Sequence, residues 1–283
     1  MFYQNVKTTY EQAPTATGSF QTPGNITLAI PANTPIAPGS EPANTPTHDE
    51  TGVPADAFNP FNPFQQIISG GTRARLIEFG NRVEDNETNA FFSTLGLKGD
   101  KLLDGSWGYD ASFRYSQIQN ISTSNQVSAS RFDRILNAAD PIFDPTSPQF
   151  IGTTIPYNAF GDYRVRIPSN AASVAFATVH PKEIDESKLA TVDVNIYTTS
   201  LFKLPAGGVG LAFGGQFRRE SLRQNPDDFL LKGDIISTTP ANFTDGGRKA
   251  YAFHAEALLL ITSMASTKLS KRRSISGIQG TLH

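Results

Sequence analysis

The residues from Trp107 to Ser116 follow a strict two-residue period, and this period constrains the fold more than any other feature of the chain. Every second position carries an aromatic or small apolar side chain: Trp107, Tyr109, Ala111, Phe113 and Tyr115. The intervening residues are Gly, Asp, Ser, Arg and Ser. Because successive side chains of a strand point to opposite faces, the segment is predicted to be a β-strand with one apolar face. About ten alternating residues with aromatic ends are typical of a strand that crosses a membrane.

Three further segments alternate in the same way. Residues 191–199 and 209–218 are predicted to form an antiparallel hairpin, because only the tight turn Leu204–Gly208 separates them. Residues from about 248 to 260 form the last alternating run. Two less regular β-rich runs, residues 72–80 and 87–98, flank Arg82–Asn86 and predict another hairpin. Together these runs predict about six antiparallel strands.

One short helix is predicted inside the segment 120–185. Ser130 is its expected N-cap, and Asp133 follows three residues later. Asp140 and Pro141 are expected to end the helix. The apolar positions at helical spacing are Phe132, Ile135, Leu136 and Ala139.

The connections between the predicted strands fall into two length classes. Those at Gly99–Gly105 and Leu204–Gly208 are short, whereas those at 120–185 and 221–247 are long. Residues 1–70 are predicted to be another long loop, because their many prolines lack the N–H that a ladder or helix needs. Outer-membrane barrels have short periplasmic turns and long outer loops, whereas a soluble sandwich has no reason to sort its loops. The asymmetry therefore indicates an outer-membrane barrel.

The composition fits a sheet of which only alternate residues meet lipid. Hydrophobic residues make up 38% of the chain, and no segment is apolar for long enough to be a transmembrane helix. The net charge of −2 predicts no binding to nucleic acid. The absence of cysteine excludes disulfides and thiolate metal sites. A basic cluster near the C-terminus lacks the interleaved aromatic residues that stack on bases; it comprises Lys268, Lys271, Arg272 and Arg273.

No segment has the pattern of a catalytic site, so we predict that the chain is not an enzyme and assign no catalytic, cofactor-binding or metal-ligating residue. The segment Gly208–Gly214 has GxGxxxG spacing, which departs from the dinucleotide-binding motif, and is interpreted as strand. Asp227, Asp228 and Asp234 are interpreted as solvated loop residues. His254 is expected on the polar face of a strand. None of the histidines has metal-ligand spacing: His48, His180, His254 and His283.

The aromatic residues of the strands are expected to contact lipid, whereas those of the long loops are candidates for contact with a solute. The stripe Trp107, Tyr109, Phe113 and Tyr115 could stack on sugars, but lipid contact is favoured. Aromatic residues in the long loops are better candidates for contact with a solute, because loops commonly carry binding residues. These loop residues are Phe150, Tyr157, Phe160 and Tyr163.

Several phrases resemble segments of the bacterial TonB-dependent outer-membrane receptors. Phe58–Phe64 (FNPFNPF) resembles an Asn-Pro-Phe segment of that family, and Arg75–Arg82 follows it as in those proteins. Gly96–Ser112 resembles the family's hairpin of glycine, turn, tryptophan and strand. Phe202–Ser221 resembles a second hairpin, and Gly233-Asp234 with Arg248–Glu256 fits the next loop and strand. The resemblance covers residues 55–262 approximately and depends on the order and spacing of these phrases.

This resemblance implies a transporter in the bacterial outer membrane. Receptors of this family have a 22-stranded barrel whose lumen is closed by an N-terminal plug. Their outer loops capture a scarce solute, such as an iron chelate, a cobalamin or a glycan. The inner-membrane protein TonB then acts on the plug. The implied partners are therefore outer-membrane lipid, a solute of unknown identity and the TonB complex, the last through a plug missing from this chain, and no cofactor is implied.

The departures from the family pattern predict a partial barrel. No plug or TonB box is recognisable, and about six strands are far fewer than 22. We therefore interpret the chain as a fragment with a long loop region at 1–70 and a partial all-β, antiparallel transmembrane barrel at 71–262. Residues 263–283 form an unassigned tail, for which out-of-frame sequence is one explanation. The alternative is a secreted or surface all-β binding module, for example a carbohydrate-binding sandwich, in which the apolar strand faces would be buried in a core.

Overall fold

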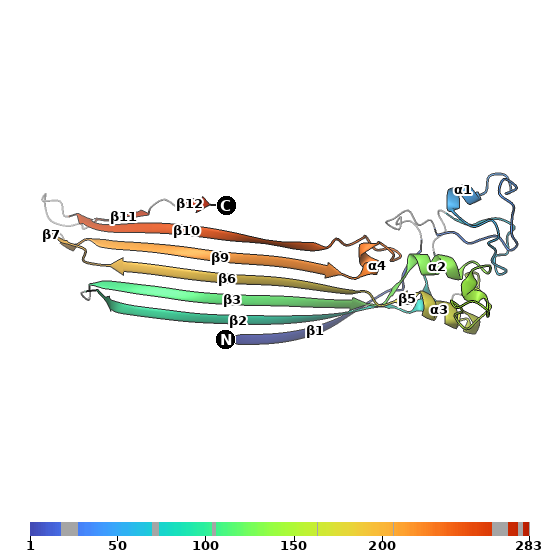
Figure 1. Cartoon of the computed structure of the whole chain (residues 1–283), viewed down its shortest axis with the longest axis horizontal. Coiled ribbons are helices and arrows are strands. Elements are labelled where there is room, and N and C mark those ends of the chain that lie inside the picture. The colour runs from blue at the N-terminus through green and yellow to red at the C-terminus, as the bar shows by residue number, and fades with distance from the viewer. Residues whose placement is uncertain are drawn as a thin grey trace.

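The chain folds into one long antiparallel β-sheet with a folded cap at one end (Figure 1). The computed structural model describes residues 1–17, 28–69, 74–103, 106–162, 164–205 and 207–261, and the backbone of residues 271–276 and 280–282. We call the end of the sheet next to the cap the cap end, and the opposite end the turn end. The predicted all-β, antiparallel class is confirmed.

Six long strands form the body of the sheet, and every neighbouring pair is antiparallel. In spatial order they are β1 (Phe2–Gln12), β2 (Arg82–Leu102), β3 (Trp107–Ser124), β6 (Lys182–Thr198), β9 (Gly210–Pro226) and β10 (Thr244–Ile261). The short strands β11 (Lys271–Ser276) and β12 (Gly280–Leu282) pair with β10. Within the described ranges β1 pairs only with β2, so the sheet is open there and does not close on itself.

The predicted hairpin of residues 72–80 and 87–98 is wrong. Residues 82–102 form the single 21-residue strand β2, and Ile77–Phe79 form a short 3₁₀ helix, η1. The expected turn residues Arg82–Asn86 pair instead with β1, and from Glu84 onward also with β3. Asp85, for example, accepts a hydrogen bond from the Thr9 hydroxyl at 2.6 Å. Cross-strand bonds of this kind let polar residues continue a strand.

The prediction of a loop from residue 1 is wrong for its first segment. Residues 2–12 form strand β1, and the described part of the long connection to β2 begins after Gln12. Phe2, Tyr3, Val6 and Tyr10 favour a strand, and the first proline is Pro14. The proline-rich composition of the whole region concealed this strand.

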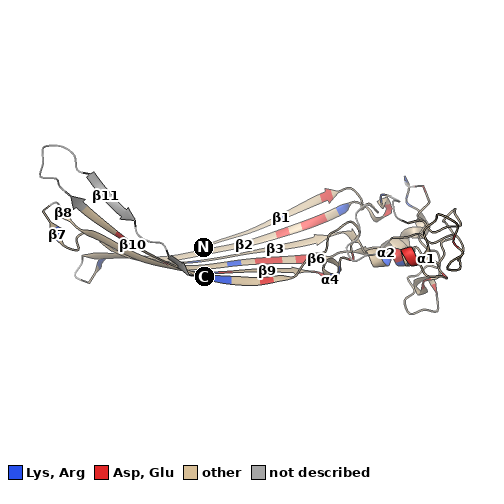
Figure 2. Cartoon of the chain, turned by 90° about the horizontal axis from the view of Figure 1, so that it is seen from above, with Lys and Arg blue, Asp and Glu red and all other residues tan. Residues whose placement is uncertain are grey.

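The other strands are longer than the alternating runs that predicted them. Strands β3 and β9 continue to Ser124 and Pro226, and β6 and β10 begin already at Lys182 and Thr244. The added segments are mostly polar. Most of the charged residues of the strands lie in this half of the sheet, next to the cap (Figure 2). The long connections therefore cover 125–181 and 227–243, shorter than predicted.

The predicted difference between short and long connections is confirmed. Strands β2 and β3 are joined at the turn end by residues 103–106, and β6 and β9 by 199–209, which include β7 (Lys203–Leu204) and β8 (Gly207–Gly208). Residues 13–81, 125–181 and 227–243 meet at the cap end (Figure 1). Their remaining elements are α1 (His48–Thr51), β4 (Gln126–Val127), α2 (Ala129–Ile135), η2 (Pro141–Phe143), η3 (Pro168–Asn170), α3 (Ala171–Ala177), β5 (Thr178–Val179) and α4 (Asp228–Leu231).

The predicted helix is present as α2, with a different cap. Ser128 accepts a hydrogen bond from the Arg131 N–H and is the N-cap, whereas the Ser130 hydroxyl donates to Asp234. Phe132, Ile135 and Leu136 are buried, as their spacing predicted. The helix ends at Ile135 rather than at Asp140 and Pro141, however, so Ala139 lies outside it and is exposed. Most of the predicted tail 263–283, and all of its side chains, lies outside the described residues.

Candidate membrane-facing surface and folded cap

One face of the turn-end half of the sheet is apolar, and we call it the apolar face. The strand register aligns the apolar positions of neighbouring strands: Phe113 lies opposite Leu95 on β2 and Val192 on β6. Val192 in turn lies opposite Phe217, and Phe217 opposite Tyr251. The other members of this face are Leu97, Tyr109, Ala111, Val194, Ile196, Leu211, Phe213, Phe253, Ala255 and Ala257.

The larger side chains of the apolar face are exposed. Leu97 and Phe253 are 64% and 65% exposed, and Val194 between them is 42% exposed. No second layer covers them in the part of the chain that the structure describes, where the core residues lie mainly in the cap. A contiguous apolar surface of this kind marks a site of contact with a partner or a membrane.

Aromatic residues border the apolar face at both ends. Trp107 and Tyr109 lie near the turn end. Towards the cap, Phe91 packs against Tyr115 with ring centroids 6.1 Å apart, and Phe217 packs against Tyr251 at 5.1 Å. Trp107 and Tyr115 are eight residues apart on β3, a distance of about 26 Å along a strand at roughly 3.3 Å per residue. This length and these borders match the apolar band of a membrane-spanning sheet.

The opposite face of the same strands is polar, and we call it the polar face. The Asp193 carboxylate lies 3.3 Å from the Arg114 guanidinium and accepts a hydrogen bond of 2.6 Å from the Gln216 amide. Nearer the cap, Glu220 forms ion pairs with both Arg218 and Arg248. Arg114, Arg218 and Arg248 are thus paired with carboxylates that the sheet itself provides.

Glycines in the strands make room for larger neighbours. A Cβ atom on Gly214 would lie 2.0 Å from the His254 ring and 2.2 Å from the Asn195 amide oxygen. His254 is on the polar face, as predicted. The segment Gly208–Gly214 lies in and between strands rather than before a helix, as its interpretation as strand required. In the described residues none of the helices is long and apolar enough to span a bilayer.

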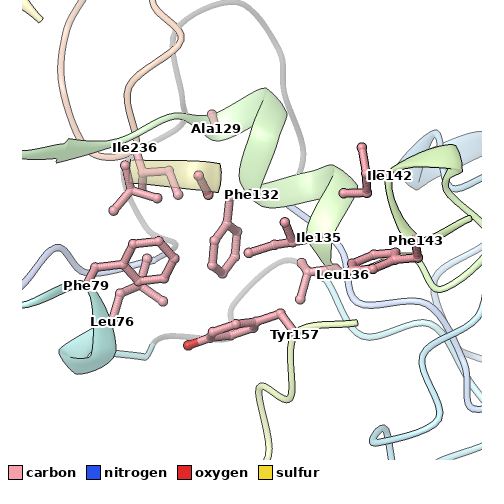
Figure 3. Packing of buried hydrophobic residues seen from close by; sticks show 12 residues of the cluster. Leu76, Phe79, Ala129, Phe132, Ile135, Leu136, Ile142, Phe143, Tyr157 and Ile236 are labelled. Atoms are coloured by element: carbon pink, nitrogen blue, oxygen red, sulfur yellow. The ribbon is translucent and has the colours of Figure 1, made fainter. Parts of the chain in front are cut away.

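The cap has its own hydrophobic core, built from all three long connections. Phe79 from the first, Phe132 and Tyr157 from the second, and Ile236 from the third pack together (Figure 3). The Tyr157 ring centroid lies 5.7 Å from that of Phe132 and 6.0 Å from that of Phe79. Burial raises the pKa of the Tyr157 hydroxyl above its usual value. The cap is therefore a folded unit with fixed side chains.

This core changes the assignment of the loop aromatics. Tyr157 is buried, so its prediction as a residue that contacts a solute is wrong. Phe150 and Phe160 are exposed on the second connection and remain available for such a contact. Tyr163 lies outside the described residues.

Two buried asparagine side chains of the FNPFNPF segment form hydrogen bonds with the backbone of the cap. The Asn59 amide nitrogen donates to the carbonyl oxygens of Leu136 at 2.9 Å and Tyr157 at 3.1 Å, and its side-chain oxygen accepts from the Phe61 N–H. Asn62 similarly donates to Pro31 and Gln66 and accepts from Phe64. Both asparagines are almost completely buried. The segment is therefore a structural element of the cap.

Two carboxylates anchor other parts of the cap. The Asp234 carboxylate on the third connection accepts hydrogen bonds from both hydroxyls at the start of α2, of Ser128 and Ser130, at 2.7 Å. Glu78 accepts from the Ile167 N–H and the Asn170 amide, each at 2.6 Å. The interpretation of Asp234 as a solvated residue is therefore wrong. Because the residues of each contact are about 90 or more positions apart, no local pattern could have identified them.

A shallow pocket lies between the first and second connections. Within it the Arg134 guanidinium binds both carboxylate oxygens of Asp140, at 2.8 and 3.0 Å. The Asp133 carboxyl lies beside this pair, and its burial and the Asp140 charge raise its pKa from 3.8 to about 6. No group of acidic or histidine side chains in the described residues is arranged to hold a metal ion. The lining residues are Ala29, Pro31, Val53, Pro54, Asp133, Arg134, Asn137 and Asp140.

Asp133→Asn is expected to stabilise the cap at neutral pH. A raised pKa means that the folded state holds the proton more tightly, so the carboxyl favours folding below pH 4 and this contribution is lost as the pH rises to 6. At pH 8 the variant should gain roughly 2 to 3 kcal/mol in the free energy of cap opening, and at pH 3.5 almost nothing. Hydrogen exchange of cap amides measures this difference.

The control is Asp144→Asn, which should show no gain in stability, because hydrogen bonds from Thr146 lower the pKa of Asp144. Equal cap stability of wild type and Asp133→Asn at pH 8 would contradict the prediction.

Comparisons with known proteins identify no relative of this chain. No family model, no curated protein and no solved structure matches it. The functional interpretation therefore depends on the residues and geometry described above.

Proposed function

We propose that this chain forms part of the barrel wall and the outer loops of a TonB-dependent receptor, which takes up a solute across a bacterial outer membrane. The observation that carries the proposal is the one-sided apolar face, bordered by aromatic residues and about as long as a membrane-spanning strand requires. In this proposal the apolar face contacts lipid and the polar face lines the lumen.

The arrangement of the connections supports the same orientation. The long connections form the cap at one end of the sheet, and short connections join the strands at the other. In outer-membrane barrels the long loops lie outside the cell and the short turns face the periplasm. The cap would therefore face the medium, where its exposed Phe150 and Phe160 could contact a solute such as an iron chelate, a cobalamin or a glycan. The order of sequence phrases that resembles the receptor family supports this assignment.

An open sheet edge in a bilayer has unpaired backbone groups, so the proposal requires further strands beside β1 and on the far side of β10. A complete receptor would supply them, together with the plug on which the TonB complex acts. In a reconstituted sample, other copies of the chain can pair with these edges.

The alternative function is that of a secreted or surface all-β binding module. It would require a second layer over the apolar face, because a soluble sandwich buries such a face. In the described residues the large side chains of this face are exposed instead, which favours the membrane proposal.

Cysteine labelling on intact cells tests the proposal. Because the chain contains no cysteine, an introduced cysteine is the only thiol of the protein that can be labelled. The chain is exported with an added signal, carrying either Ala55→Cys in the cap or Lys203→Cys at the turn end, both of which are exposed positions. A membrane-impermeant maleimide is expected to label the cap variant on intact cells. It should label the Lys203→Cys variant only after the outer membrane is permeabilised.

The two variants serve as controls for each other, because they share the sheet and differ only in the end that is labelled. Equal labelling of both variants on intact cells, or recovery of both in the soluble periplasmic fraction, would contradict the proposal. The second result would support the binding-module alternative.

A further inference from the structure

A pair of unneutralised cations lies directly beyond the apolar face, at the cap-side aromatic border. Arg219 on β9 lies opposite Lys249 on β10, two residues beyond Phe217 and Tyr251 respectively. Because side chains alternate, Arg219 and Lys249 project from the same side of the sheet as these two aromatic residues. Both cations are exposed. They therefore lie where the apolar face ends and the polar half of the sheet begins.

The surroundings of these cations differ from those of the neighbouring cations on the polar face. One residue along each strand, Arg218 and Arg248 share the carboxylate of Glu220. Neither Arg219 nor Lys249 has an ion pair or side-chain hydrogen bond in the part of the chain that the structure describes. The sheet thus provides a carboxylate partner for Arg218 and Arg248, whereas none of its described residues neutralises Arg219 or Lys249.

This arrangement costs stability unless an anion is present. Like charges directly opposite each other on neighbouring strands repel, and opposed Cα atoms are only about 4.5 to 5.5 Å apart. A third cation, Lys188, lies diagonally from Arg219 on β6, but its ammonium is 2.7 Å from Glu186. The site therefore offers two free positive charges at short range. A phosphomonoester carries a charge of about −1.5 to −2 near pH 7 and has several acceptor oxygens.

We propose that Arg219 and Lys249 bind the phosphomonoester head group of a membrane lipid at the cap-side edge of the apolar face. This inference depends on the proposed function, because the lipid reaches the pair only when the apolar face is in a bilayer. Long basic side chains at such a border keep their apolar stems along the band and their charges among the head groups. A phosphodiester lipid, with a single negative charge, is expected to bind the pair more weakly.

The test uses the full chain, reconstituted into phosphatidylcholine vesicles that contain equal small amounts of phosphatidic acid and phosphatidylglycerol. Native mass spectrometry of the released chain then measures which lipids remain bound. Phosphatidic acid is expected to be enriched over phosphatidylglycerol on the wild-type chain. The double variant Arg219→Gln/Lys249→Gln should bind phosphatidic acid about 25-fold more weakly, since each cation near an anionic lipid contributes about 1 kcal/mol.

The matched control is Arg218→Gln/Lys98→Gln, which removes one Arg and one Lys from the polar face of the same sheet. It should retain the preference for phosphatidic acid. Insertion of the Arg219→Gln/Lys249→Gln chain with an unchanged preference would overturn this inference alone, as would equal binding of the two anionic lipids by the wild type. Failure of the wild-type chain to enter the vesicles would overturn the proposed function as well.

Discussion

Asn59→Ala is expected to open the cap. The substitution removes the amide that donates to the Leu136 and Tyr157 carbonyls and accepts from the Phe61 N–H. All three backbone groups would then lie in a buried site without this partner, and each such group costs about 1 to 3 kcal/mol. The free energy of cap opening should therefore fall by roughly 3 to 5 kcal/mol. Hydrogen exchange in the full chain measures this loss as an increase of at least about a hundredfold in the exchange rate of cap amides.

Two further variants make the result specific. Asn59→Asp keeps the shape and the bond to Phe61, but places acceptor oxygens against two carbonyls, so it should be at least as damaging as alanine. Asn158→Ala removes an asparagine that accepts one exposed hydrogen bond, from the Phe160 N–H, and should change exchange little. A cap that tolerates both substitutions at Asn59 would contradict the role assigned to the FNPFNPF segment.

The turn-end half of the sheet could be predicted from the sequence because its pattern is local. Each apolar side chain from Trp107 to Tyr115 alternates with a polar or small one, and this period alone defines a two-faced strand. The cap-end half has no such period. There the strands are extended by hydrogen bonds between side chains of neighbouring strands, such as that from the Gln117 amide to Glu186 at 2.5 Å. These bonds cannot be predicted from one strand alone, because they depend on which strand pairs with it.

The cap could be predicted only in part, for a related reason. Helix α2 was recognisable because Phe132, Ile135 and Leu136 recur at helical spacing within a few residues. The contacts of Asn59 and Asp234 join residues 77 to 106 positions apart, so no window of sequence contains both partners. The FNPFNPF segment is conspicuous in the sequence, but its structural role depends on these distant partners.

Val194→Arg is expected to prevent stable insertion into a bilayer. Val194 lies in the middle row of the apolar face, opposite Ala111 and Gly215. An arginine on the lipid side of a barrel strand costs about 2 to 4 kcal/mol at the bilayer midplane. The inserted fraction should therefore fall by a factor of about 30 or more relative to wild type. In water, a substitution at this exposed position would change stability by only about 0.5 kcal/mol or less.

Gln216→Arg is the matched control for this substitution. Gln216 is on the polar face of the adjacent strand β9, where its amide donates to Asp193, and a guanidinium can keep that contact. The two variants add the same charge at nearly the same height of the sheet and differ in the face that receives it. Gln216→Arg is expected to insert as well as wild type.

The most direct test of lipid contact by the apolar face is fluorescence quenching of Trp107, the single tryptophan of the chain. Wild type, Val194→Arg and Gln216→Arg are each mixed with vesicles whose lipids carry bromine on the acyl chains close to the head group. Strong quenching for wild type and Gln216→Arg, with almost none for Val194→Arg, is the result that lipid contact predicts. Equal quenching of the two variants, or none for wild type, would contradict it.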